Sequence, residues 1–413
     1  MKQANFALQN FSIEVAGEAH PFTLNQVLML RYVEDIQSAT VRMEAQITDS
    51  QSGVLSKIEG MEPVVIAIQD EDENVLEMGM VIYDVQDRVM VAGKSKITIL
   101  LCSRDLINNT AIKVSKRFGA GEGKNIGDLV EKDIMGGLLQ TQLNVDVEAT
   151  LNKYSFISPY WTPFTMIRWL ATKAIAAPKE GGAPSSSAGY AFFQNKDGYV
   201  FWSYDKLASQ ELTTTASNQF ILGYEVGELE DMKEKLSIDK VTVKSSNDIL
   251  QGMNYGSYVS TVMTLDLKDM KYEEHPFDIN KYYGSVPRLN QETPVPKYFE
   301  NFDETTPTRV MSKLLDTALF TEGTFTQDTT KYTSQSTLRE KLFYNRCVEV
   351  EFIGKLDHKV GDVVQLYTFT GPDKDEDSTS GKYIIGRIER EFISRNDQMT
   401  TKMLLYTDSP GNY

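Results

Sequence analysis

The sequence has few of the features that mark a membrane, secreted or metal-binding protein. Its 413 residues contain no run of about 18 apolar residues, the length that spans a bilayer. The amino terminus lacks the apolar stretch of a signal peptide, so we expect folding in a cytoplasm. The two cysteines, Cys102 and Cys347, lie in separate strand-like apolar runs, which predicts buried thiols and neither a disulfide nor a zinc site.

Catalytic motifs are also missing. The glycine-rich stretch 119–125 resembles a phosphate loop, but Phe118 and Asn125 stand where a Walker A loop needs Gly and Ser or Thr. No G-x-S-x-G elbow of a serine hydrolase occurs. The three histidines, His20, His275 and His358, have no HExxH spacing. We therefore predict no catalytic, cofactor-binding or metal-binding residues, and a protein that is not an enzyme.

Two acidic stretches, 70–74 and 373–377, have the alternating carboxylates of a calcium-binding loop. Both lack the turn glycine and the later bidentate glutamate, whose places are taken by Val75, Val81, Ser378 and Ile384. Without these two residue types the loops are expected to be solvated hairpin tips, not metal sites.

Positive charge is scarce, and the net charge is −16. This excludes proteins that grip nucleic acid tightly, because neutralisation of phosphates by Lys and Arg supplies most of that affinity. Two interpretations of the acidity stay open. It can serve solubility alone, or it can suit a channel through which a polyanion must slide.

What the sequence does contain is a repeat near its two ends. Each copy has short β-rich runs broken by Gly and Asp, the pattern of a small barrel. The matching runs are Glu62–Ile68, Gly79–Tyr83 and Ile97–Asp105 in the first copy, and Asp362–Tyr367, Gly386–Arg390 and Lys402–Asp408 in the second. Chance similarity between β segments is the alternative. Two similar barrels per chain would let a trimer match a six-fold partner.

Helical patterns lie between the two copies. One helix is predicted after Asn125, with an apolar stripe, and another after Thr162, with Pro163 at its first position. The stripes are Ile126, Leu129, Val130, Ile134 and Leu138, and Met166, Ile167, Trp169, Leu170 and Ala174. The stretch 179–189 has the composition of a flexible loop. A hairpin follows, in which Phe192, Phe193, Tyr199, Phe201 and Trp202 are interpreted as core packing in preference to a sugar-stacking or base-stacking surface.

These patterns predict a mainly β fold with α+β insertions: two small tube-like β-barrel domains and an α+β middle domain. We expect a first barrel over residues 1–105, the middle domain over 106–230, and a second barrel over 231–275 and 341–413. The second barrel is expected to be interrupted by an insertion, residues 276–340, with a helix that carries Val310, Leu314, Leu315 and Leu319.

In their order along the chain, four stretches resemble the baseplate hub proteins of contractile-tailed phages, which are related to the hub part of type VI secretion spike proteins. The stretches are Ile47–Ser50 with Ile58–Val64, Leu101–Asp105 with Val114–Phe118, Tyr190–Phe193 with Asp197–Phe201, and Ser246–Asp248 with Tyr255–Tyr258, Asp266 and Lys271–Tyr272.

The resemblance implies a structural protein of the virion, assembled in the bacterial cytoplasm. It implies a homotrimeric, pseudo-hexameric ring that joins a six-fold tail tube, or a tube-initiator protein, to a three-fold central spike. Other baseplate proteins would surround the ring, DNA would pass through it without tight binding, and no part would insert into a membrane. The chain ends at Tyr413 without a β-helical repeat, so we expect a hub without a fused spike. The alternative is a tail-associated cell-wall hydrolase or glycan-binding protein.

Overall fold

The fold is described here from a computed structural model of the chain. It describes residues 6–49, 53–91, 94–119, 123–177, 188–212, 215–222, 235–245, 248–267, 269–284, 286–291, 307–315, 331–370, 375–396 and 398–411. Strands dominate, as the alternation in the sequence predicts. None of the helices in these ranges is long and apolar enough to cross a membrane.

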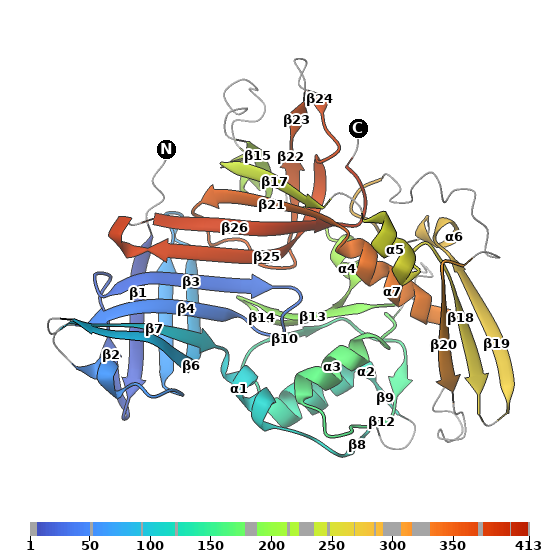
Figure 1. The fold of residues 1–413 in the computed structure, drawn as a ribbon, viewed down its shortest axis with the longest axis horizontal. Helices are drawn as coiled ribbons and strands as arrows, with labels where there is room; N and C mark the ends of the chain where they lie inside the picture. The colour runs from blue at the N-terminus through green and yellow to red at the C-terminus, as the bar shows by residue number, and fades with distance from the viewer. Residues whose placement is uncertain are drawn as a thin grey trace.

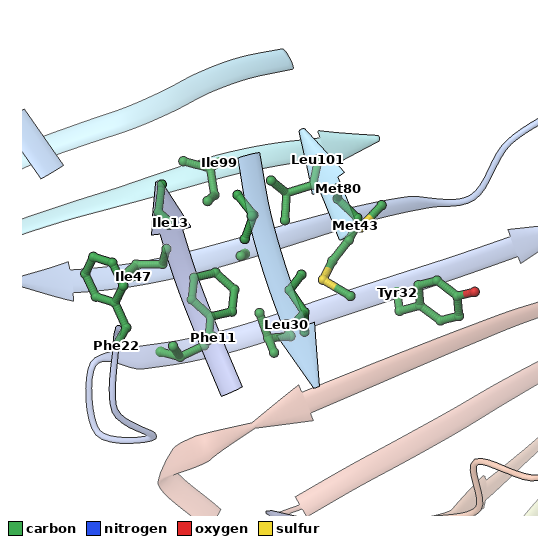
Figure 2. Close-up of a cluster of buried hydrophobic side chains, with 14 of the residues drawn as sticks. Phe11, Ile13, Phe22, Leu30, Tyr32, Met43, Ile47, Met80, Ile99 and Leu101 are labelled. Atoms are coloured by element: carbon green, nitrogen blue, oxygen red, sulfur yellow. The ribbon is translucent and has the colours of Figure 1, made fainter. Parts of the chain in front are cut away.

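The first quarter of the chain is almost entirely β. Its elements are β1 (Ala7–Val15), β2 (Glu18–Pro21), β3 (Val27–Asp35), β4 (Arg42–Asp49), the short 3-10 helix η1 (Val54–Lys57), β5 (Pro63–Gln69), β6 (Val75–Val91) and β7 (Lys94–Cys102). Strand β4 shows why: Met43, Ala45 and Ile47 are buried while the residues between them are more exposed, which is the period of two that a half-buried strand requires. Figure 2 shows Met43 and Ile47 in the apolar core that the strands enclose, a core that also contains Ala45.

Helices and a hairpin follow. The elements are α1 (Arg104–Ala111), β8 (Arg117–Phe118), β9 (Lys124–Asn125), α2 (Ile126–Asp128), the π-helical segment η2 (Leu129–Leu139), β10 (Val145–Val147), β11 (Lys153–Tyr154), β12 (Phe156–Ile157), α3 (Pro163–Ala171), β13 (Tyr190–Asn195), β14 (Gly198–Ser203) and α4 (Tyr204–Ala208). Both predicted helices form. The first continues from α2 into η2, and α3 has Pro163 in its first turn. Most of the loop predicted at 179–189 lies outside the described residues.

The remaining elements complete the C-terminal half. They are η3 (Ala216–Asn218), β15 (Gln219–Leu222), β16 (Leu236–Ile238), β17 (Lys240–Ser245), α5 (Ile249–Tyr255), β18 (Val259–Asp266), β19 (Lys271–Asp278), α6 (Ile279–Tyr283), β20 (Arg309–Leu315), α7 (Lys331–Phe343), β21 (Arg346–Ile353), β22 (Val363–Tyr367), β23 (Phe369–Thr370), β24 (Asp375–Glu376), β25 (Gly381–Ile393), η7 (Ser394–Asn396) and β26 (Gln398–Thr407).

The repeat read from the sequence is a repeat of strand topology. An N-terminal unit (β3, β4, β5, β6 and β7) has the spatial order β3-β4-β7-β6-β5, and a C-terminal unit (β17, β21, β22, β25 and β26) has the order β17-β21-β26-β25-β22. All neighbours are antiparallel, and corresponding strands follow one another in the same order along the chain. The insertion that carries α5 to α7 lies between β17 and β21, at the place of the short β3–β4 connection.

A β-bulge fixes how the two units correspond. In the N-terminal unit Ile82 lies opposite Leu101, and the next paired residue is Asp84, so one residue is extra. In the C-terminal unit Ile385 lies opposite Leu405, and Gly386 is the extra residue. In the sequence, the second run of each copy begins with a glycine, Gly79 and Gly386, which pairs these two residues. The bulge shows that the structural equivalent of Gly386 is Tyr83 instead. Bulges bend and twist the strand that carries them, so both units turn at the same point.

The structure differs from the sequence-based expectations at three places. The described strands do not form two separate closed barrels, because β25 pairs with β3 and one fourteen-stranded sheet runs through both units (Figure 1). The helix predicted around Val310 is wrong: residues 309–315 form β20, and Leu319 lies outside the described residues. The predicted strand at Tyr258 forms, but β18 pairs with β19 and β20 in a separate three-stranded sheet.

The error at β20 has a physical cause. Val310 and Leu314 lie four residues apart, a spacing that fits a helix as well as a buried strand. Strand β20 runs parallel to β18 over seven residue pairs, from Ser260 opposite Arg309 to Asp266 opposite Leu315. A long-range pairing of this kind overrides local periodicity.

Candidate functional site at the junction of the two units

The two units meet along a single pair of strands. β25 of the C-terminal unit lies antiparallel to β3 of the N-terminal unit, in register from Arg387 opposite Asp35 to Ile393 opposite Met29. Figure 1 shows the two strands, one red and one blue, side by side in the middle of the sheet. Because strand pairs are stabilised by their facing side chains, the residues of this seam decide how the units are joined.

On the core side of the seam, the C-terminal unit completes the core of the N-terminal unit. Phe392 of β25 lies opposite Leu30 of β3, and both are fully buried in the N-terminal cluster. The ring of Phe392 contacts that of Phe6 edge to face, with 5.3 Å between centroids. Leu356 and Met399 from the C-terminal unit also lie in this cluster. The core of the N-terminal unit is therefore completed by residues from the C-terminal part of the chain.

A buried ion pair lies next to this apolar contact. The guanidinium Nη1 of Arg390 lies 3.7 Å from Oε1 of Glu34, and both side chains are fully buried. Glu34 also accepts hydrogen bonds from the hydroxyl of Tyr32 at 2.9 Å and from the backbone N–H of Val360 at 2.8 Å. Burial raises the pKa of the Glu34 carboxyl, although the charge of Arg390 opposes that effect.

The loop between β21 and β22 supplies the other hydrogen-bond partners of Arg390. The guanidinium of Arg390 donates to the carbonyl oxygens of Lys355 at 3.3 Å and His358 at 2.6 Å. Lys196, in the turn between β13 and β14, donates to the carbonyl oxygens of Leu356 at 2.6 Å and Asp357 at 2.7 Å. The loop therefore ties three segments together: both units and the β13–β14 hairpin.

The first acidic loop belongs to the same junction. Asp70 Oδ2 accepts a hydrogen bond from the backbone N–H of Leu356 at 2.8 Å, and Asp72 forms an ion pair with Lys355. The expectation of a purely solvated tip is therefore wrong for Asp70, which is buried. No cluster of three or more His, Cys, Asp or Glu side chains suited to a metal occurs in the described ranges. Part of the second acidic stretch, residues 373 and 374, lies outside them.

The solvent side of the seam carries paired charges. Arg31 of β3 lies 3.3 Å from Glu44 of β4, and 3.5 Å from both Glu389 and Glu391 of β25. Arg31 is partly exposed, so each pair contributes little to stability on its own, typically about 0–1 kcal/mol. The pairs do match charge across the seam, which favours one register of β25 on β3 over another.

A second buried arginine anchors the insertion. The Nε of Arg339 on α7 lies 2.6 Å from Asp205 on α4, and its Nη1 lies 3.1 Å from Asp408 after β26. Its Nη2 donates to the carbonyl oxygen of Pro287 at 3.0 Å. All three charged side chains are buried, so the insertion helix is fixed to both the β14–α4 segment and the C-terminal unit.

Sequence reasoning did not single out Glu34, Arg390 or Arg339. Alternation could have found the first two, because Arg390 shares a strand face with Ile388 and Phe392, and Glu34 shares one with Leu30 and Tyr32. A charge at the apolar positions of a strand pattern indicates a buried ionic contact. No comparable pattern marks Arg339, whose helix has no strong apolar stripe.

The candidate residues of the sequence do not converge. His20 lies on β2, His275 on β19 near Glu273, and His358 in the β21–β22 loop. His358 is buried, with Nδ1 3.0 Å from Asp357 and Nε2 2.8 Å from the carbonyl oxygen of Ser217. The three lie on three different elements, so they form no common site in the described part of the chain.

The cysteines and the aromatic set are where packing predicts them. Cys102 and Cys347 are free thiols buried at the ends of strands, and burial raises the pKa of both to about 11. The aromatic residues of the hairpin face two cores: Phe193 packs with the C-terminal unit, and Phe192, Tyr199 and Phe201 pack with α3 and η2. Only Trp202 is partly exposed, under the ammonium of Lys206. Core packing is confirmed for the other four.

No protein-family model and no curated protein matches the sequence. Among solved structures, the chain is similar to the tail protein from Neisseria meningitidis MC58, with a TM-score of 0.56 and 11% identity over 98% of this chain and 97% of that one. It is also similar to the 43 kDa tail protein of prophage MuSo2 from Shewanella oneidensis, with a TM-score of 0.54 and 9% identity over 97% and 98%.

A third similar structure is a chain of the lidded Francisella PdpA-VgrG complex. The TM-score is 0.51 and the identity is 10%. The match covers 100% of this chain and 54% of that one. The fold of this chain is therefore that of phage tail proteins and of part of a VgrG complex, which confirms at the level of fold the resemblance read from the sequence.

Proposed function

We propose that this chain is the structural hub of a phage tail baseplate, a homotrimer whose six quasi-equivalent units form a ring around the DNA channel. The observation that carries the proposal is the repeated strand order in two units of one chain, joined side by side through β3 and β25. Three such chains would present six similar units, which matches a six-fold tube on one side and a three-fold spike on the other.

The similar structures support this proposal. Two of them are tail proteins that match this chain over nearly the whole of both lengths, so the same arrangement of elements occurs in proteins of phage tails. The similarity to a chain of a VgrG complex supports a spike protein as one partner. Tail tube or tube-initiator proteins and other baseplate proteins are the further proposed partners, and the virion tail is the proposed location.

We also propose the domain division 1–105, 106–230, 231–275 with 341–413, and 276–340, with the two units as two β domains that share one sheet. Four apolar clusters support the division in outline: one mainly from the first 101 residues with Leu356, Phe392 and Met399 added, one centred on η2 and α3, one mainly from the C-terminal unit, and a small one around Tyr258 and Leu338. The shared side chains at the seam imply that the two units fold together.

The proposed role is structural and not enzymatic. Burial of Phe192, Phe193, Tyr199 and Phe201 removes the aromatic surface that a glycan-binding alternative would have used. Release of dye from labelled peptidoglycan by the purified protein would favour the hydrolase alternative instead.

The test of the hub is its assembly. Light scattering of the purified chain should give the mass of three 46.6 kDa chains, and negative-stain images should show three-fold rings with a central hole. A stable closed dimer, or a compact trimer without a hole, would contradict the proposal.

A further inference from the structure

One continuous ribbon of strands runs through both units, and at each of its ends an edge lacks a partner strand among the residues that the structure describes. Its order is β17-β21-β26-β25-β3-β4-β7-β6. At one end, β17 pairs with β21 and, in the described ranges, with no strand on its other side. At the other end, the N-terminal half of β6 pairs with β5, but from Tyr83 onward its only partner among the described strands is β7. Open edges of this kind can pair with another chain.

The equivalence of the two units shows what each edge lacks. β25 is the counterpart of β6, and its corresponding half is covered by β3. β17 is the counterpart of β3, since each pairs with the strand that follows it in its unit. The edge of β6 therefore lacks a strand in the position of β3, and β17 is a strand of that kind without its second partner.

We propose that β17 of one chain pairs antiparallel with the open edge of β6, from Tyr83 onward, in a second copy of this chain. The contact would repeat between chains the seam that β3 and β25 form within one chain. It is heterologous, because two different edges meet, and such contacts close into rings when the rotation between copies allows it. The inference rests on the proposed hub and specifies which surfaces join its subunits.

The register follows from the seam already present. Within the chain, Phe392 lies opposite Leu30 and Glu391 opposite Arg31. We count residues along β6 and β25 from the bulge that both strands share. Between Gln86 and Val89, β6 has one residue more than β7, and with this second bulge included Met90 corresponds to Phe392 and Val89 to Glu391. By the same count, Val241 corresponds to Leu30 and Thr242 to Arg31. We expect Met90 opposite Val241, and Val89 opposite Thr242.

Exposed apolar side chains on both edges fit this contact. Met90 is 65% exposed and Val89 50% exposed on β6, and Val243 is 50% exposed on β17. Phe392, the counterpart of Met90, is buried in the core of the other unit. Val241 already packs against the C-terminal core, so Met90 of the neighbouring copy would extend that core as Phe392 extends the N-terminal one.

The two edges differ in net charge. β17 carries Lys240 and Lys244, while β6 from Tyr83 onward carries Asp84, Asp87 and Arg88. In the expected register Lys244 lies opposite Gln86 and Lys240 opposite Val91, so neither lysine meets a cation on the facing strand. Lys244 already forms an ion pair with Glu349 at 3.0 Å, as Arg31 does with Glu44 at the intramolecular seam. The excess of positive charge on β17 and of negative charge on this part of β6 favours the approach of these two unlike edges.

Cysteine cross-linking tests the register. A chain with Val89→Cys and Thr242→Cys, oxidised gently, should give covalent species up to a trimer on a non-reducing gel. Each single variant should stop at dimers or monomers. The matched control combines Val89→Cys with Lys240→Cys, two residues out of register, where the side chains are about 7–8 Å apart and should cross-link far less.

A charge placed in the contact tests its energetic role. Met90→Glu would place a carboxylate in the buried seam and should weaken trimer formation on the order of 100-fold or more. The single chain should fold normally, because Met90 is exposed within it. Met270→Glu, at a 72% exposed methionine outside the seam, should leave the trimer intact.

The outcomes separate this inference from the proposed function. A trimeric wild type with no cross-link between Val89→Cys and Thr242→Cys, or with equal cross-linking in the control pair, overturns the β17–β6 contact and leaves the hub standing. A wild type that forms no trimer, and a cysteine pair that gives no covalent trimer, overturns both.

Discussion

Arg390 of β25 and Glu34 of β3 form an ion pair, with 3.7 Å between Nη1 and Oε1, across the seam that joins the two units. Neither side chain reaches solvent, and Glu34 also accepts hydrogen bonds from Tyr32 of its own strand and from the backbone N–H of Val360 in the β21–β22 loop. Buried ion pairs contribute little net stability but are costly to break, because the remaining charge stays desolvated. This pair therefore disfavours other arrangements of the two units more than it strengthens the observed one.

Breaking the pair is expected to destabilise the whole chain. Arg390→Met should lower the free energy of unfolding by about 3–5 kcal/mol, since Glu34 would lose its buried countercharge. Adding Glu34→Gln should recover at least about 1 kcal/mol of that loss, because the uncompensated charge is then removed. Urea denaturation measures both. Arg387→Met, at a more exposed ion pair with Glu389, is the control and should cost less than about 1 kcal/mol.

The loss in Arg390→Met should depend on pH. Burial already raises the pKa of Glu34, and removal of Arg390 raises it further. A carboxyl whose pKa is higher in the folded state binds protons more readily there, so folding gains stability from this group as pH falls. The difference in unfolding free energy between wild type and Arg390→Met should therefore be smaller at pH 5 than at pH 8. A difference that is flat with pH would indicate that Glu34 is already protonated, or that it lies in solvent.

The two thiols should be inert in the folded protein. Burial raises the pKa of Cys102 and Cys347 to about 11, so at pH 8 roughly 0.1% of each would be thiolate. A disulfide reagent added to native protein should label neither, and should label both after unfolding in guanidinium. Rapid labelling of one thiol without denaturant would show that its strand is exposed.

Metal removal should change little. The acidic stretch 70–74 lacks the turn glycine and bidentate glutamate of a calcium loop, and Asp70 bonds instead to the backbone of Leu356. Incubation with a chelator should leave the melting temperature unchanged within error, and added calcium should not raise it. A drop of several degrees with chelator, restored by calcium, would contradict this expectation.

The assembled protein should hold DNA weakly. A net charge of −16 per chain makes repulsion the default, although Lys and Arg could still gather on one surface. Filter binding with duplex DNA at low ionic strength should show no submicromolar affinity. Tight binding that weakens steeply with added salt would reveal a basic surface with several phosphate contacts, because each contact adds about −0.9 to the slope of log affinity against log salt.

The sequence determined the secondary structure wherever local pattern and burial agree. Alternation in β4, the cap and proline before α3, and the β13–β14 hairpin all fold as predicted, because each pattern depends on residues close in the chain. The repeat was readable in part. The runs at β5 and β22 and at β7 and β26 correspond, but the sequence matched Gly386 to Gly79, four residues from its structural equivalent Tyr83, because no local pattern marks the bulge.

Tertiary structure alone decided how those strands are shared. The pairing of β25 with β3 joins residues more than 350 positions apart, and it turns two expected barrels into one sheet with a buried Glu34–Arg390 pair. Likewise β20 is a strand because β18 supplies its hydrogen bonds. Contacts between residues far apart in sequence leave little local signal. Each side of such a contact has only to be compatible with its partner, and many local sequences meet that requirement.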